Sequence, residues 1–389
     1  MPIRDSAPPR RRLLLRGAAA SVAAAGLPRL LHAAERGVTG TELIVGQNIT
    51  LQGGKNAYGG EVMAGIGTLI ESVNKAGGVA GRRIVLRTLD DDNKSALAEV
   101  NAKRLVDEGA FMLFGSVEGG PSTAVASVAT AAQVPFFGPM AGSPGLRRPH
   151  LPMVFPVRAE HREEFRALIR WALDIGLKRV ALLHSDSEVG RQHLENVRLL
   201  TAEAKASFGY GLAFKSEIDD GGIGALVDKL RNEPVDVVIN HGSAGVYERV
   251  IRRARDVGLG VTFAGVNSSS SQLAQALGPL AKGMVFSQVM PSPWARKTAL
   301  TREYQAALAA RFPGRDFSYG SLEGYATAKA LVTVLRQAGG DLTRSSLVRA
   351  LHGTNLDLGG LHVRYRPGDH EGSTFVDLAI ITREGRFLQ

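Results

Sequence analysis

The sequence predicts an α/β fold of two lobes, each built on a doubly wound parallel sheet, and three observations lead to this prediction. From residue 41 onward, short β-branched runs alternate with longer amphipathic stretches, a pattern typical of strands joined by right-handed crossover helices. The candidate strands and helices are too many for a single doubly wound sheet. A chain of 389 residues, of which 44% are hydrophobic, is long enough for two or three domains.

The strands are predicted from short apolar runs and the helices from the amphipathic stretches between them. The predicted strands cover residues 43–49, 84–89, 111–114, 134–137, 180–184, 211–216, 235–240, 261–264 and 283–288. The predicted helices cover residues 58–76, 95–108, 121–132, 162–175, 190–207, 222–232, 245–257 and 270–277.

After residue 296 the pattern changes. It predicts helices at 296–311, 321–338 and 344–351, then β stretches at 361–365 and 375–382 joined by the turn-rich PGDHEGS.

Two proline-containing segments, 149–156 and 290–293, predict connections between the lobes, because proline holds the residue before it extended. If both cross between lobes, each lobe is discontinuous in sequence. We therefore expect one lobe from residues 38–157 plus 288–374 and the other from 158–287 plus 375–389.

Residues 1–34 are predicted to be an export signal. Arginines at 10–12 precede an Ala/Leu-rich stretch near 13–27, and small residues close the segment, which is the layout of a secretory signal. The arginine pair before the leucines resembles the twin-arginine type and implies export to a bacterial periplasm, with cleavage after Ala33 or Ala34. The alternative is an uncleaved anchor, although the apolar run is shorter than the ~20 residues of a membrane span.

Composition excludes several classes of function. The chain has no cysteine, so disulfide scaffolds, thiolate zinc sites, iron–sulfur clusters and cysteine nucleophiles are impossible. Six arginines and one aspartate in the first 34 residues supply half of the net charge of +10. The rest carries a small surplus and no basic stripe with interleaved aromatic residues, so nucleic acid is not an expected partner.

Catalytic, nucleotide and metal motifs are also missing from the sequence. No HExxH, GxxxxGK[ST] or GxGxxG is present, so no cofactor and no metal are expected, and His184 and His241 are interpreted as satisfied loop histidines. The acidic run at 90–92 is interpreted as a solvated loop followed by an N-cap. Ala141–Gly145 imitates a nucleophile elbow, but Pro144 lacks the N–H that an oxyanion hole needs.

Gly/Ser-rich turns instead follow three predicted strands, at 116–122, 138–145 and 267–271. In open parallel sheets, ligands bind outside the carboxyl ends of the strands. Small residues let backbone N–H groups approach a ligand, and the start of the next helix favours an anionic group. Ordinary turns share this composition, but three of them in a two-lobed exported chain favour a binding cleft.

Nearly the whole mature chain resembles one known family, the periplasmic leucine/isoleucine/valine-binding proteins of ABC importers (type I periplasmic binding proteins). The most specific part is NKAGGVAGRRIVLRTLDDDN at 74–93. The other matching segments are Val45-Gly46, Tyr58-Gly59, Val134-Pro135, Gly138-Pro139, RRARDVG at 252–258 and Gly283.

The resemblance implies two lobes that are joined by a three-strand hinge and close on a small ligand, in the manner of a Venus flytrap. In the amino-acid-binding members, turns after the third and fourth strands hold the ligand carboxylate, and an aromatic side chain borders the pocket. The corresponding residues here are Tyr58, Gly119, Gly120, Ala141, Gly142 and Ser143.

The sequence departs from the family pattern in the second lobe. Asn267 stands at or beside the position of the acid that pairs with a ligand ammonium, and Val189 and Ser243 stand at aromatic positions. A buried ammonium needs a counter-charge. Glu118 or Glu188 could provide it, although Glu118 would repel a ligand carboxylate. A branched-chain amino acid therefore competes with an amide, a urea-like compound or an organic acid.

We expect a periplasmic receptor that performs no covalent chemistry and delivers its ligand to ABC permease subunits at the inner membrane, because closure on the ligand is what a permease can read. The expected ligand-binding residues are Tyr58, Glu118, Gly119, Gly120, Ala141, Gly142, Ser143 and Asn267. The alternatives are a sensory binding protein of the same fold, which hands its signal to another protein, and an α/β enzyme.

Overall fold

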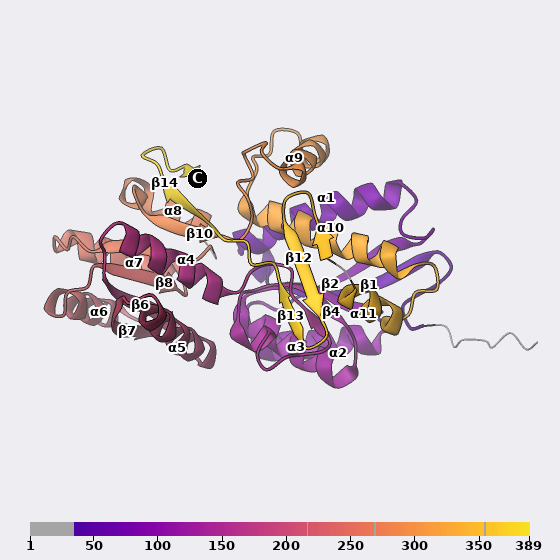
Figure 1. The fold of residues 1–389 in the computed structure, drawn as a ribbon, viewed down its shortest axis with the longest axis horizontal. Coiled ribbons are helices and arrows are strands. Elements are labelled where there is room, and N and C mark those ends of the chain that lie inside the picture. The colour runs from indigo at the N-terminus through magenta and orange to yellow at the C-terminus, as the bar shows by residue number, and fades with distance from the viewer. Residues whose placement is uncertain (1–34, 216, 268–269, 354) are drawn as a thin grey trace, which may run out of the picture. The chain divides into compact units, whose positions relative to one another are not determined.

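The fold is described from a computed structural model that covers residues 35–215, 217–267, 270–353 and 355–389 (Figure 1). The predicted export signal lies outside the described residues. The same holds for Ser216, at the end of one predicted strand, and for residues 268–269 of the predicted turn at 267–271. Within the described residues, no helix is both long enough and apolar enough to cross a membrane.

The first lobe contains a five-stranded parallel sheet with the order β2-β1-β3-β4-β5. Its strands are β1 Glu42–Ile49, β2 Arg83–Asp90, β3 Met112–Val117, β4 Phe136–Met140 and β5 Val154–Phe155. The helices between them are α1 Ala57–Lys75, α2 Ser95–Asp107 and α3 Gly119–Ala132. β3 and β4 are buried along their full length, so helices cover both faces of the sheet centre, as parallel sheets require.

The second lobe contains a seven-stranded sheet with the order β15-β14-β10-β9-β8-β6-β7. Its strands are β6 Arg179–Ser185, β7 Ser207–Phe214, β8 Val237–His241, β9 Thr262–Gly265, β10 Val285–Gln288, β14 Asp377–Ile381 and β15 Phe387–Leu388. The helices are α4 His161–Asp174, α5 Glu188–Glu203, α6 Asp220–Asn232, α7 Ala244–Asp256 and α8 Ser270–Leu277. The five strands from β7 to β10 are parallel, whereas β14 and β15 are antiparallel additions at one edge.

The chain returns to the first lobe after β10. It forms α9 Ala299–Arg311, α10 Tyr319–Ala338 and α11 Arg344–His352, followed by an antiparallel sheet of β11 Asn355–Asp357, β12 His362–Arg366 and β13 Asp369–Gly372. In Figure 1 the yellow C-terminal part of the chain therefore appears both at β12 and β13 and beside β10 as β14. Short 3₁₀ turns complete the list at Gln52–Gly54, Pro144–Leu146 and Gly278–Ala281.

Helices α1 and α10 pack unusually closely. A Cβ atom on Gly65 would lie 1.9 Å from the backbone oxygen of Ser321, and one on Gly324 would lie 2.2 Å from that of Val62. The two glycines therefore allow backbone-to-backbone contact that no other residue would permit. This contact fixes the N-terminal turn of α1, which carries Tyr58, against α10.

The predicted alternation of strands and helices and the two lobes built on parallel sheets are confirmed, and two local predictions are wrong. The helix predicted at 190–207 ends at Glu203, and β7 begins at Ser207. The PGDHEGS segment, predicted as turns, contains β13. The parallel part of the second sheet is extended at one edge by β14, which pairs antiparallel with β10. Polar edge strands of a few residues lack the apolar run from which a strand is predicted.

Candidate functional site

A small pocket of about 70 Å³ lies where the two lobes meet. Residues of the first lobe and of the second lobe both line it. They are Ala57, Tyr58, Glu61, Tyr319 and Gly320 from the first lobe, and Asn267, Ser270, Ser271, Gln272 and Gln275 from the second. Tyr58 and Asn267, both predicted to bind ligand, therefore border the same space from opposite sides.

A buried carboxylate, Glu164 at the start of α4, organises one side of this region. Its Oε1 accepts hydrogen bonds from Arg158 and from His161 Nδ1 (2.8 Å). Its Oε2 accepts from the backbone N–H of Asn267 (3.0 Å) and from Ser287 Oγ (2.7 Å). With four donors, the fully buried Glu164 is satisfied as a buried charge must be.

Arg158 lies in the segment that connects β5 to α4, and only 1% of it is exposed. Besides its bond to Glu164, it donates from Nη2 to Asn267 Oδ1 (3.1 Å), and its Nε lies 3.9 Å from Glu323 Oε1. Burial opposes the charged form of Arg158, but Glu164 and Glu323 outweigh it and raise the pKa of the guanidinium. The Asn267 side-chain oxygen thus accepts from the Arg158 guanidinium. Asn267 therefore does not take the place of the acid that pairs with a ligand ammonium in the family.

The half-buried Tyr58 and the buried Glu323 form a second hydrogen-bonded pair within the first lobe. Tyr58 Oη donates to Glu323 Oε2 at 2.5 Å. Burial, and then the neighbouring Glu323, raise the pKa of Tyr58, and burial raises the pKa of Glu323. Glu323 Oε1 has no hydrogen-bond partner, so this carboxyl can still accept or, if protonated, donate a hydrogen bond.

The N-terminus of α3 contributes the predicted turn after β3. Gly119 and Gly120 are its first two residues, and Glu118, at φ 66°, is the N-cap residue without a capping side-chain bond. A Cβ on Gly119 would lie 2.5 Å from Ser143 Oγ, which is buried and has no hydrogen-bond partner. Backbone N–H groups and one hydroxyl therefore gather at a helix N-terminus, a combination that suits a carboxylate or another polar acceptor.

Ala141 and Gly142 form the other predicted turn, after β4, and both contribute backbone atoms. Ala141 O accepts a hydrogen bond from Arg147 Nη1 (3.4 Å), and Gly142 O accepts one from the N–H of His161 (3.0 Å). A Cβ on Gly142 would lie 2.6 Å from that same nitrogen. Burial lowers the pKa of Arg147 to about 10, which leaves the guanidinium charged at neutral pH.

The structure brings the predicted residues together in two groups. One contains Glu118, Gly119, Gly120, Ala141, Gly142 and Ser143, and the other contains Tyr58 and Asn267. Glu118 is close enough to Tyr58 to influence its pKa, and burial raises the pKa of Glu118 itself. Neither group includes Glu188, which is exposed and pairs with Arg191.

Val189 and Ser243, which stand where the family has aromatic side chains, have different surroundings. Val189 Cγ1 would be 3.6 Å from a Cβ on Gly119, so this side chain faces the turn from the second lobe. Ser243 instead caps α7, because its Oγ accepts from the N–H of Val246 (3.4 Å).

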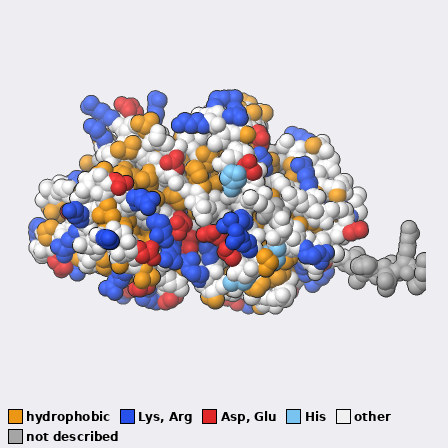
Figure 2. All heavy atoms as spheres, viewed as in Figure 1, with side chains coloured by type: hydrophobic (Ala, Val, Ile, Leu, Met, Phe, Trp, Pro, Cys, Tyr) orange, Lys and Arg blue, Asp and Glu red, His pale blue; other side chains and the backbone are white. Residues whose placement is uncertain are grey.

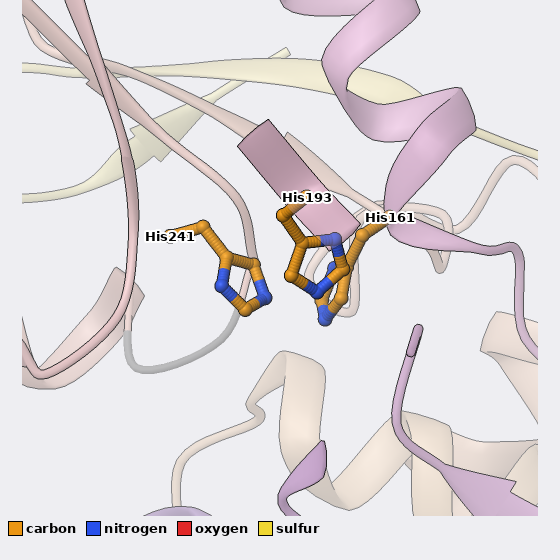
Figure 3. A group of neighbouring side chains, drawn as sticks. All are labelled: His161, His193 and His241. Carbon is orange, nitrogen blue, oxygen red and sulfur yellow. The ribbon is translucent and has the colours of Figure 1, made fainter. Parts of the chain in front are cut away.

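Sequence reasoning missed three groups in this region: Arg158, Glu164 and a cluster of His161, His193 and His241 (Figure 3). The interpretation of His241 as a satisfied loop histidine is wrong, since its Nδ1 has no partner. His184 is a satisfied histidine, because its Nδ1 lies 3.0 Å from Ser185 O. The one sequence signal was His161 three residues before Glu164, which places both on one helical face.

The acidic run at 90–92 is also different from its sequence interpretation. Asp91 is fully buried and accepts hydrogen bonds from Asn48 Nδ2 and Thr50 Oγ1, both at 2.6 Å. Asp90 accepts from the backbone N–H groups of residues 51–53. The N-cap of α2 is Lys94, which makes no capping side-chain bond. The first two carboxylates therefore hold the loop that leads into α1, and the run is not a solvated loop.

Positively and negatively charged side chains are intermixed on one face of the molecule. On the face shown in Figure 2, Lys and Arg side chains lie beside Asp and Glu side chains. Several are paired, for example Arg148 with Glu160 and Arg166 with both Glu163 and Glu203.

Two α/β lobes with a polar pocket between them define a binding protein that encloses a small molecule. Comparison with known proteins agrees: the model of the periplasmic binding protein family matches residues 42–385. The chain belongs to this family, which consists of solute-binding proteins and not of enzymes, and its members are proteins of the periplasm.

Individual relatives have similar architectures. The chain is 25% identical over 330 residues to "Leu/Ile/Val-binding protein homolog 3" of Brucella melitensis, covering 80% of this chain and 83% of the relative. A solved structure of a possible leucine/isoleucine/valine-binding protein from Rhodopirellula baltica gives a TM-score of 0.82 at 25% identity, over 90% of this chain and 96% of the other. A substrate-binding periplasmic protein from Ralstonia solanacearum gives 0.78 at 25% identity, over 89% and 99%.

Proposed function

We propose that the chain is the periplasmic receptor of an ABC importer, that it reaches the periplasm by the twin-arginine route, and that it binds a small polar metabolite between its lobes. The observation that carries the proposal is the pocket that Tyr58 and Asn267 border from opposite lobes. Because both lobes contribute, a ligand that contacts both stabilises the closed arrangement, and closure is the signal that a permease can recognise.

The proposed ligand presents an acceptor group, a carboxylate or an amide oxygen, to the N-terminus of α3. The support is the unpartnered Ser143 Oγ beside Gly119 together with the first N–H groups of the helix. A helix N-terminus favours negative charge near it. Glycine at 119 lets the Ser143 hydroxyl approach this helix N-terminus, since a Cβ there would lie 2.5 Å from Ser143 Oγ.

The other end of the ligand determines its class. Glu164 already accepts four hydrogen bonds, and Asn267 carries no charge, so neither provides a free counter-ion for an ammonium. Glu323, with one unpartnered oxygen, is the acid that we propose as the counter-charge, although Glu61 lines the same pocket and Glu118 lies beside the turn at Gly119. We therefore propose an amide, a urea-like compound or an organic acid as the ligand, or an amino acid whose ammonium pairs with Glu323.

A thermal-shift screen over amino acids, amides, urea-like compounds and small carboxylates tests the proposal. A ligand at 100 times its Kd adds about 2.7 kcal/mol to the free energy of unfolding, which raises the melting temperature measurably. Ser143→Ala should reduce the shift for every active compound. Its control is Ser127→Ala, an exposed hydroxyl farther along α3, which should not change it.

Glu323→Gln separates the two ligand classes. If the active compounds carry an ammonium that pairs with Glu323, the variant should abolish their thermal shift, because that counter-charge has been removed. If they lack one, the shift should persist. A library in which no compound raises the melting temperature, or a shift that is the same in Ser143→Ala, would refute the proposed site.

A further inference from the structure

Three histidine side chains meet inside the second lobe. His161 begins α4, His193 lies on α5 and His241 ends β8. One ring nitrogen of each lies within 4.8 Å of the other two, and the ring centroids are 3.8–5.2 Å apart. Figure 3 shows the three rings turned toward one another.

The nitrogens of this cluster lack the partners that buried polar atoms normally have. Both ring nitrogens of His193 and Nδ1 of His241 are buried without a hydrogen bond, and His193 is 0% exposed. A buried polar group without a partner costs about 1–3 kcal/mol. Several such atoms pointing at one another indicate a shared partner, because native structures rarely leave this cost uncompensated.

The donor set suits a metal ion. Imidazole binds metal in its neutral form, and His161 and His193 are buried, at 4% and 0% exposed. His161 Nδ1 faces Glu164 Oε1 at 2.8 Å, which leaves Nε2 free. A metal-bound histidine typically has such a carboxylate on its other nitrogen.

The required adjustment is small. For metal–nitrogen bonds of 2.0–2.1 Å in a tetrahedral site, the three nitrogens would stand about 3.4 Å apart. The present separations, up to 4.8 Å, need an inward shift of about 1 Å, which side-chain rotations can supply. Arg158 and Arg147 add nearby positive charge, but Glu164 lies between Arg158 and His161 and accepts from both, which offsets part of the repulsion.

We propose that His161, His193 and His241 bind one divalent late-transition-metal ion, with Zn²⁺ as the representative. Imidazole suits Zn²⁺, Cu²⁺ and Ni²⁺, and three protein ligands leave one position of a four-coordinate ion open. Gly142, whose Cβ position would be 2.7 Å from the His161 ring, places the site beside the turn proposed to hold the solute. The metal site nevertheless stands independently of the proposed solute.

Zinc titration of the untagged, chelator-stripped protein by calorimetry tests the proposal without any solute. We expect one equivalent to bind and the melting temperature to rise. Co²⁺ in place of Zn²⁺ should give the intense visible absorption of a four-coordinate site. In His193→Leu the affinity should fall by more than the roughly 10–100-fold that changes to supporting residues around a metal produce.

His193→Leu should itself fold, because leucine removes two unpartnered nitrogens and packs against Phe165, which is 5.5 Å from the His193 ring. His241→Asn provides a second variant with the same expected loss of zinc. The matched control is His352→Gln, since His352 and His370 form a separate histidine pair (2.7 Å) in the first lobe. Zinc binding that survives in both cluster variants, or that only the control abolishes, would overturn the proposal, as would no binding at all.

Discussion

Gly142→Ala is expected to destabilise the protein, because the added methyl group has nowhere to go. Its Cβ would lie 2.6 Å from the backbone nitrogen of His161 and 2.7 Å from the ring atom Cγ, whereas ordinary contacts begin at 3.4 Å. Either the turn or the first residue of α4 must shift by about 0.8 Å, and overpacking of this kind costs about 1–3 kcal/mol. With an unfolding entropy of about 2.1 cal/mol/K per residue, that cost lowers the melting temperature by about 1–4 °C.

Differential scanning calorimetry measures this shift, and the same turn offers a matched control. Gly145→Ala would place its Cβ 3.7 Å from Thr123 Cγ2, an ordinary contact. Neither glycine has a left-handed backbone conformation, so alanine is strained at neither position by its φ angle, and the difference isolates the clash. Equal melting temperatures for the two variants would refute the reasoning.

Three further predictions concern buried charges. Asp90 is partly buried, which opposes its ionisation, yet backbone N–H bonds hold its pKa at about 2, below the usual 3.8. The stabilisation that ionised Asp90 provides is therefore present above pH 3.8 and lost as the pH falls toward 2. Chemical denaturation at pH 7 should show Asp90→Asn to be less stable than the parent. A difference in the free energy of unfolding that stays constant down to pH 2 would contradict this. Tyr58→Phe deprives Glu323 of its hydrogen bond and should cost about 1–3 kcal/mol by the same measurement; no loss would show that the bond contributes nothing. Glu164→Leu should cost more than Arg158→Met, because the first removes the acceptor of four donors and the second leaves Glu164 three of its four; the reverse order would be inconsistent with this network.

The sequence was sufficient to predict the central strands of both sheets. These strands are largely buried, so they appear as apolar runs, and the observed β1, β6 and β9 each agree with the prediction within one residue at either end. The short strand β13 did not have this signal. The four residues of β13, DHEG at Asp369–Gly372, form a strand because β12 supplies a hydrogen-bonding partner. Pairing between two segments is a tertiary property that a local sequence pattern does not contain.

Only those parts of the candidate site that consist of backbone turns could be predicted from the sequence. The turns around Gly119 and Gly142 carry their signal in composition, because close approach of a backbone requires small residues. The cluster of His161, His193 and His241 carries no such signal, since three elements separated by dozens of residues bring it together. Sequence motifs detect ligands that are regularly spaced along one helix. The three histidines lie on three different elements, so no such spacing exists among them.

The distribution of hydrogen bonds around Glu164 bears on how the lobes separate. Its donors lie on the inter-lobe connection, on α4, after β9 and on β10, so every one belongs to the second lobe or to the segment that leads into it. The network contacts the first lobe through the 3.9 Å approach of Arg158 to Glu323, the hydrogen bond from the His161 N–H to Gly142 O (3.0 Å) and the one from Arg147 Nη2 to Arg158 O (2.8 Å). Lobe opening can separate these contacts while all four bonds of Glu164 persist, because none of them involves an oxygen of Glu164. Because Glu164 also fixes His161, the same bonds would keep the histidine cluster intact as the cleft opens.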